Sequence, residues 1–158
     1  MTRGPTRLEI AVSYATGRAG IPAAVSFRRW VSAALEGRIR EADLAIRLVG
    51  DDEGLALNRH YRGKDRPTNV LSFPAELDDI HLPEGVTLPL LGDIVLCAPV
   101  VAREAREQGK ALNAHYAHLT VHGVLHLLGW DHQDEREALA MEQLEREILA
   151  ALGIDDPY

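Results

Sequence analysis

The chain contains a single cysteine, Cys97, among its 158 residues, so a disulfide within the chain is excluded. This usage is typical of a reducing compartment. Cys97 follows the apolar run Ile94–Leu96, and we expect it to be a buried core residue. No apolar run is long enough to cross a bilayer, and residues 1–10 lack the apolar region of a signal peptide. We therefore expect a cytoplasmic protein without a membrane partner.

Basic residues are also scarce, because 17 lysines and arginines stand against 24 aspartates and glutamates, and the formal net charge is -7. An acidic chain is ill suited to coating nucleic acid nonspecifically, although this net charge leaves room for a local basic site. The acids gather within residues 134–147, where we expect them to form the solvated face of a helix. These residues are Glu135, Glu137, Glu142, Glu145 and Glu147.

The chain has 46% hydrophobic and 26% charged residues, which is the composition of an ordinary globular protein. Its length favours a single domain over residues 1–158. Apolar runs and alternating apolar positions predict four strands. The strands are expected over residues 8–12, 44–48, 69–73 and 91–97. Residues 75–90 carry prolines and acids and are predicted to form a surface loop or lid.

Helical patterns lie between these strands and dominate the rest of the chain. Ser26 and Asp51 are predicted to cap two helices, and Asp134 is predicted to cap the last one. Two further helices are expected over residues 100–108 and 112–128. Strands mixed with helices, followed by a helical C-terminal half, indicate an α+β or mixed α/β fold.

The most informative segment, residues 122–132, reads HGVLHLLGWDH. His122 and His126 are four residues apart and would lie on the same face of a helix. Gly129 is placed to end that helix, after which the chain can turn back and bring His132 to the same point. Three neutral imidazoles with one open coordination position are typical of a catalytic zinc site. We therefore expect one Zn²⁺ per chain, on a helix of the C-terminal half.

The residues around these histidines bear on which kind of metal site this is. Zinc peptidases with the same histidine spacing need a glutamate directly after the first histidine as general base, and here that residue is Gly123. Asp131 could orient an imidazole or a water molecule, and His115 and His118 could support a metal ligand. Imidazole also suits nickel, copper and iron, so the histidines alone do not select zinc.

Residues 59–68 form a second cluster, with four cations around one acid in an otherwise acidic chain. Glycine and proline here predict a shaped turn at the start of a strand, where functional loops are common. A solvated turn is the alternative. The planar fork of arginine matches two phosphate oxygens, so this cluster and the three histidines together predict a phosphodiester site. The four cations are Arg59, Arg62, Lys64 and Arg66.

Three segments resemble the YbeY family of bacterial rRNA maturation factors. Residues 122–132 are similar to the histidine signature of that family, and residues 61–74 and 91–97 are similar to two further segments, in the same order. Trp130 stands where tyrosine is commoner. The resemblance implies a metal-dependent endoribonuclease that acts on single-stranded RNA in small-subunit rRNA 3′-end maturation and in ribosome quality control. It also implies a mixed sheet of about four strands packed with helices.

The resemblance further implies roles for single residues. It makes Arg62 the catalytic arginine and assigns three zinc ligands, which are His122, His126 and His132. Three other cations of the basic cluster are candidates for binding the substrate, namely Arg59, Lys64 and Arg66. The expected partners are single-stranded rRNA, the small ribosomal subunit and its associated factors.

The expected reaction is attack of a zinc-activated water on the phosphodiester while Arg62 clamps the phosphate. The alternative nucleophile is the 2′-hydroxyl of the RNA itself. Two other functions stay open at this point. One is a zinc peptidase-like hydrolase, which Gly123 disfavours, and the other is a noncatalytic ribosome-assembly factor.

Overall fold

The computed structural model describes residues 7–63, 68–75, 90–131 and 133–158. Over these residues the chain forms four strands and five helices. The strands are β1 (Arg7–Tyr14), β2 (Glu41–Val49), β3 (Val70–Pro74) and β4 (Leu90–Cys97). The helices are α1 (Ala24–Leu35), α2 (Asp51–Arg62), α3 (Ala98–Gln108), α4 (Leu112–Leu127) and α5 (Glu135–Ala151). None of the helices in this described part is long and apolar enough to cross a bilayer.

The strands form one mixed sheet in the order β1-β2-β4-β3. The three strands β1, β2 and β4 run parallel, and β3 runs antiparallel to β4 at the sheet edge. Pro74 is the last residue of β3, and a residue without an N–H group can occupy this place because β3 is an edge strand of the sheet that the described residues form. The predicted α+β fold with a four-stranded mixed sheet is confirmed.

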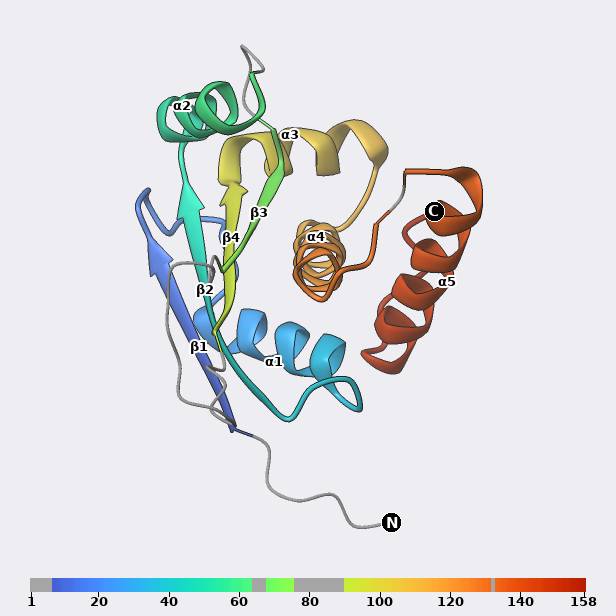
Figure 1. The fold of residues 1–158 in the computed structure, drawn as a ribbon. Coiled ribbons are helices and arrows are strands. Elements are labelled where there is room, and N and C mark those ends of the chain that lie inside the picture. The colour runs from blue at the N-terminus through green and yellow to red at the C-terminus, as the bar shows by residue number, and fades with distance from the viewer. Residues whose placement is uncertain (1–6, 64–67, 76–89, 132) are drawn as a thin grey trace, which may run out of the picture.

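The helices cover the sheet unevenly, as Figure 1 shows. Helices α1 and α4 lie against one face, and α5 packs on the far side of α4, whereas α2 and α3 lie beyond the carboxyl ends of β2 and β4. The main apolar core fills the space between the sheet, α1, α4 and α5. Cys97 belongs to a smaller buried cluster beneath α2 and α3, so the prediction that it is a core residue is confirmed.

Helix α4 is the central element of the molecule. It packs against β3, β4, α1, α3 and α5, so nearly all of its circumference is covered. Within residues 115–127 every residue is buried except His122 and His126, which are partly exposed. A helix enclosed in this way needs apolar residues all round, and the two histidines therefore mark the place where it reaches solvent.

Two predicted helix starts are wrong by one or more residues. Helix α1 begins after Ala23, which is in an extended conformation, and the N–H of Ser26 donates to the Ala23 carbonyl at 3.0 Å. Ser26 therefore lies inside the first turn and does not cap it. Helix α2 is capped by Gly50, and Asp51 is its first residue. An acid in that first turn stabilises the helix through the helix dipole and not through a cap hydrogen bond.

The predicted start of α5 is confirmed. The side chain of Asp134 accepts a hydrogen bond from the Glu137 N–H at 2.8 Å. The carboxylate of Glu137 in turn accepts from the N–H of Gln133 at 3.3 Å, one residue before the cap. These two bonds satisfy donors at the helix end that have no partner within the helix. They fix the start of the helix that packs behind α4.

Gly92 allows β3 and the end of α4 to approach β4 closely. Its φ of +146° lies in a region that favours glycine. A Cβ atom at this position would collide with the carbonyl oxygen of Phe73 and would lie 2.9 Å from Cδ2 of Leu127. Both neighbours belong to elements that position the histidines, because β3 packs on α4 and Leu127 is the last residue of α4.

We expect the substitution Gly92→Ala to lower the free energy of unfolding by about 3 kcal/mol, because backbone strain adds about 1–3 kcal/mol and overpacking adds a similar amount. Urea unfolding followed by circular dichroism measures this change. Gly17→Ala is the control, since a Cβ atom there meets nothing within 4 Å. Equal unfolding midpoints for the two variants would contradict the role given to Gly92.

Candidate metal centre

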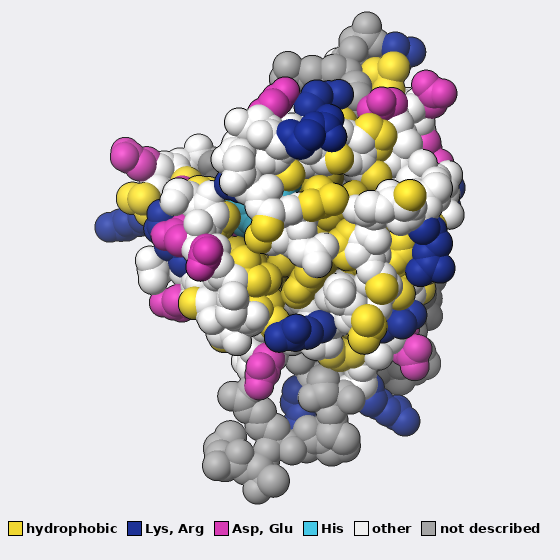
Figure 2. All heavy atoms as spheres, turned by 180° about the vertical axis from the view of Figure 1, so that it is seen from behind, with side chains coloured by type: hydrophobic (Ala, Val, Ile, Leu, Met, Phe, Trp, Pro, Cys, Tyr) yellow, Lys and Arg dark blue, Asp and Glu magenta, His cyan; other side chains and the backbone are white. Residues whose placement is uncertain are grey.

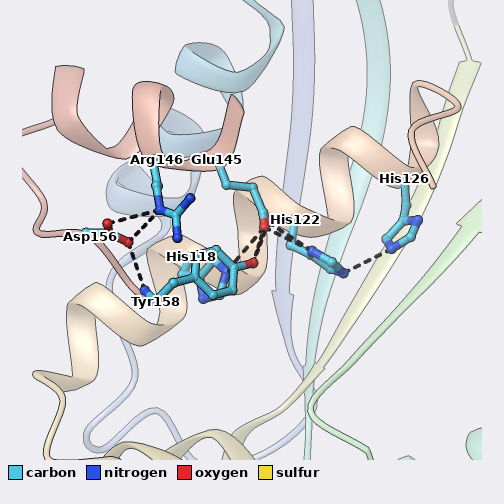
Figure 3. A network of polar contacts seen from close by, with 7 residues as sticks. All are labelled: His118, His122, His126, Glu145, Arg146, Asp156 and Tyr158. Atoms are coloured by element: carbon cyan, nitrogen blue, oxygen red, sulfur yellow. Dashed lines mark hydrogen bonds and ion pairs between the residues drawn. The ribbon is translucent and has the colours of Figure 1, made fainter. Parts of the chain in front are cut away.

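Two imidazoles of α4 face one another at short range. His122 and His126 are one turn apart, and their Nε2 atoms are separated by 3.0 Å (Figure 3). Two ligands of a tetrahedral zinc ion, each about 2.0–2.1 Å from the metal, lie about 3.3 Å apart. The two ring nitrogens therefore have nearly the separation that ligands of one ion require.

The other nitrogen of His122 is held by a buried carboxylate. The Nδ1–H of His122 donates to Oε2 of Glu145 at 3.1 Å, and Glu145 has no exposed surface. An ionised carboxylate can only accept, so Nδ1 carries a proton, and the tautomer that this bond favours has the lone pair on Nε2, which faces His126. A carboxylate behind a histidine in this way is common at metal sites, where it fixes the tautomer and the ring orientation.

Three donors surround the carboxylate of Glu145. Besides His122, the hydroxyl of Tyr158 donates to Oε1 at 2.6 Å, and Nε2 of His118 lies 3.4 Å from the same oxygen. Burial alone would raise the pKa of Glu145, but the hydrogen bonds from His118, His122 and Tyr158 outweigh burial and bring the pKa to about 2. Glu145 is therefore ionised at neutral pH.

The prediction that Glu145 belongs to a solvated helix face is wrong. Glu135, Glu137 and Glu147 are exposed as predicted, but Glu145 is fully buried. It lies four residues after Met141 and four before Leu149, which are both buried. Helical spacing was the signal that could have placed it on the inward face. Tyr158 follows α5 outside any periodic pattern, so no local signal indicates its contact with Glu145.

The end of α4 has the predicted turn. Gly129 adopts a φ of +98°, its N–H donates to the carbonyl of His126 at 3.0 Å, and the N–H of Trp130 donates to the carbonyl of Leu125 at 2.9 Å. Asp131 follows and is half-buried. His132, the third predicted ligand, lies outside the described residues. Among the residues that are described, no three histidine, cysteine, aspartate or glutamate side chains form a metal-binding group.

The two other histidines of α4 differ in their partners. His118 contacts Glu145 and so belongs to the surroundings of His122. His115 lies 2.9 Å from Oε1 of Glu104 on α3, and burial lowers the pKa of its imidazole. The rings of His115 and His118 are 6.5 Å apart. His118 therefore supports the histidine pair through Glu145, whereas His115 joins α4 to α3.

The basic cluster is only partly described. Arg59 is exposed on α2, and Arg62 is the last residue of that helix. Lys64 and Arg66 lie outside the described residues, as do residues 76–89 of the predicted loop. The described backbone therefore places the first half of the cluster at the end of α2.

Strand β3 joins the end of α2 to the middle of α4. The ring of Tyr61 packs against the ring of Phe73 with centroids 4.8 Å apart. The hydroxyl of Ser72 donates to the carbonyl of Gly123 at 3.2 Å. Neighbouring residues of a strand point to opposite faces. The end of α2 and the histidine-bearing part of α4 thus contact the same strand from its two faces.

Comparison with known proteins identifies the family. A family model described as Endoribonuclease YbeY matches residues 20–153. The chain belongs to the YbeY family of endoribonucleases. The matched range includes the histidine pair, Glu145 and the end of α2.

Relatives in the YbeY family match the whole chain. It is 79% identical over 158 residues to Endoribonuclease YbeY of Stenotrophomonas maltophilia and 75% identical to Endoribonuclease YbeY of Xanthomonas axonopodis pv. citri. Each match covers 100% of this chain and 98% of the relative. The fold is similar to the solution structure of TM1509 from Thermotoga maritima, with a TM-score of 0.59, 25% identity and 91% of each chain covered.

Proposed function

We propose that this chain is a zinc-dependent endoribonuclease of the cytoplasm that cleaves single-stranded RNA. Its proposed role is small-subunit rRNA 3′-end maturation and ribosome quality control, with the small ribosomal subunit and its factors as partners. One domain over residues 1–158 would carry the activity. The observation that supports this proposal most is the pair of facing Nε2 atoms in a member of the YbeY family, with Glu145 behind His122.

The residues present fit a metal ion. The lone pair of His122 Nε2 is directed toward His126, and the tautomer that exposes it is fixed by Glu145. The proposed ligands of one Zn²⁺ are His122, His126 and His132. Three protein ligands leave one coordination position open, which is typical of catalytic zinc. When bound, the metal would supply a Lewis acid that lowers the pKa of water to about 7.

The proposed contribution of the basic cluster is to hold the phosphate. Arg62 would place its planar fork on nonbridging oxygens and offset the charge that develops on them. Arg59, Lys64 and Arg66 would contact neighbouring phosphates of the strand. Asp131 would orient an imidazole near the end of α4. No glutamate or aspartate directly follows His122 to act as a general base. We propose water as the nucleophile, because the metal with its open coordination position would lower the pKa of water and so take the place of that base.

A peptidase activity is disfavoured by the packing of Gly123. A Cβ atom at this position would lie 3.2 Å from two side-chain atoms of Ile94 and from Oγ of Ser72. The position therefore faces the sheet at close range. A glutamate there would have no room, and its carboxylate would point away from the exposed edge of the histidine pair. The general base of zinc peptidases cannot be supplied from this residue.

The first prediction from this function concerns metal content. Purified protein should contain about one zinc per chain, and the double variant His122→Ala/His126→Ala should lose most of it, because ligands of one ion act together. Inductively coupled plasma mass spectrometry measures the metal. His60→Ala is the control, since His60 is exposed on α2. Unchanged zinc in the double variant would refute the assignment of these ligands.

A second prediction concerns Arg62. Arg62→Ala should reduce cleavage of single-stranded RNA roughly a hundredfold, the scale for loss of one preorganised electrostatic donor. Arg62→Lys should be nearly as damaging, because lysine keeps the charge but lacks the fork. Zinc content and circular dichroism should stay unchanged, and Arg29→Lys, at an exposed position of α1, should retain full activity. A normal cleavage rate for Arg62→Ala would favour a noncatalytic assembly factor.

A third prediction distinguishes the nucleophiles. Attack by water leaves a phosphate monoester and a hydroxyl, whereas attack by the 2′-hydroxyl leaves a cyclic phosphate. We expect monoester ends, and we expect an RNA with a single 2′-deoxy substitution at the cleaved position still to be cut. Mass spectrometry of the products from a defined RNA decides between them. Cyclic phosphate ends together with full resistance of the deoxy substrate would rule out attack by water.

A further inference from the structure

The segment after α5, residues 154–158, folds back onto the helices that carry the site. We call this segment the strap. The N–H of Ile154 donates to the carbonyl of Leu149 at 2.8 Å. The carboxylate of Asp156 accepts from Nε of Arg146 at 3.0 Å and from the N–H of Tyr158 at 2.9 Å (Figure 3). The strap is therefore fastened to α5 by a defined set of hydrogen bonds that ends at Tyr158.

The ring of Tyr158 joins the surface to a buried charge. Tyr158 is 52% exposed, yet its hydroxyl reaches both carboxylate oxygens of Glu145, at 2.6 and 3.1 Å. The guanidinium carbon of Arg146 lies 5.1 Å from the centroid of the ring, and the His118 ring meets it edge to face at 5.2 Å. The ring therefore covers Glu145 on the side away from His126, as Figure 3 shows.

We propose that Tyr158 is a positioning residue for the metal centre, which acts on His122 through Glu145. This inference rests on the proposed function, in that His122 is taken as a ligand. The 2.6 Å bond from Tyr158 is the shortest that the carboxylate receives, and the bond from His122 is 3.1 Å. A carboxylate fixed by its strongest partner holds its second oxygen in one place. That oxygen then keeps the His122 ring turned so that Nε2 faces His126.

Loss of the Tyr158 hydroxyl would leave the carboxylate of Glu145 free to turn, but the protein would stay folded. Without the Tyr158 hydroxyl, the hydrogen-bond partners of Glu145 within the described residues are His118, at 3.4 Å, and His122, at 3.1 Å, and the carboxylate can turn toward either. The ring of the phenylalanine variant would still cover the site through its contacts with Arg146 and with the His118 ring, although the 3.1 Å contact between the hydroxyl and Nε2 of His118 would be lost. The substitution is therefore expected to change the orientation of the His122 ring more than the stability of the folded protein.

The test compares two variants that each lose one tyrosine hydroxyl. Tyr158→Phe removes the bond to Glu145 together with the contact to Nε2 of His118. Tyr14→Phe removes a bond of similar length, 2.7 Å to the carbonyl of Pro22, at the far end of β1. Zinc affinity is measured by competition with a chelator, and the thermal midpoint of the metal-free protein is measured beside it. We expect Tyr158→Phe to weaken zinc binding about tenfold or more and Tyr14→Phe to leave it unchanged, because partners of ligand histidines typically contribute 10–100-fold.

A double-mutant cycle tests whether Tyr158 acts through Glu145. Glu145→Ala removes both oxygens that the Tyr158 hydroxyl contacts. If Tyr158 acts through this residue, Tyr158→Phe should cause no further loss of affinity in the Glu145→Ala background. Multiplying losses would overturn the proposal, and so would a Tyr158→Phe protein that has a lower thermal midpoint but the wild-type zinc affinity.

A readout without metal separates this proposal from the proposed function. In the metal-free wild-type protein, the Nδ1 proton of His122 should give a signal in a nitrogen-15-edited proton NMR spectrum, because its hydrogen bond to Glu145 slows its exchange with water. Tyr158→Phe should make this proton exchange faster with water, and Tyr14→Phe should not. A wild-type protein that binds no zinc would refute the metal centre but leave this comparison intact. Equal exchange rates in the wild type and Tyr158→Phe would refute the role of Tyr158.

Discussion

A buried charge is the constraint on which the arrangement of the site depends. Glu145 has no exposed surface, and an ionised carboxylate out of water costs several kcal/mol unless it is paired and hydrogen-bonded. Its donors come from two places, His118 and His122 on α4 and Tyr158 in the segment after α5. Helix α5 can therefore pack on α4 only in the register that brings these donors to the carboxylate. The same register sets the orientation of the His122 ring.

The opposite side of α4 is held in place by close packing against the sheet and not by charge. Gly123 lets the helix backbone come within contact of Ile94 and Ser72, and Gly92 lets the end of the helix meet β4. An alanine at Gly123 would already press on its neighbours, so the distance between helix and sheet has little freedom. His122 and His126 thus project from a helix that is clamped on one side by packing and on the other by hydrogen bonds. Such support is what holds a functional group in one geometry.

The parts of the site that could be predicted from sequence are those that depend on one helix. The spacing of His122 and His126 and the stop at Gly129 need only the period of 3.6 residues, and both features are found in the structure. Glu145 was misplaced because the acidic run was interpreted by its composition, while its helical position pointed inward. Ser26 failed as a cap because the extended backbone at Ala23 starts the helix earlier. The strand order and the contact of Tyr158 arise from tertiary packing, which no local pattern encodes.

The negative net charge of the chain is a physical reason why the proposed RNA contacts would be few and confined to the basic cluster. Affinity for RNA phosphates comes mainly from cations that release counterions, and it grows with their number. The chain has a net charge of -7, and Figure 2 shows its basic side chains interspersed with acidic ones on one face of the molecule. If RNA binds as proposed, its affinity would therefore depend on the four cations of residues 59–66. Few phosphate contacts mean weak binding to any RNA that meets this cluster alone. Under the proposed function, such an endoribonuclease would leave most RNA untouched, whereas a substrate held in place by further contacts, such as rRNA within a ribosomal subunit, would gain the residence time that cleavage needs.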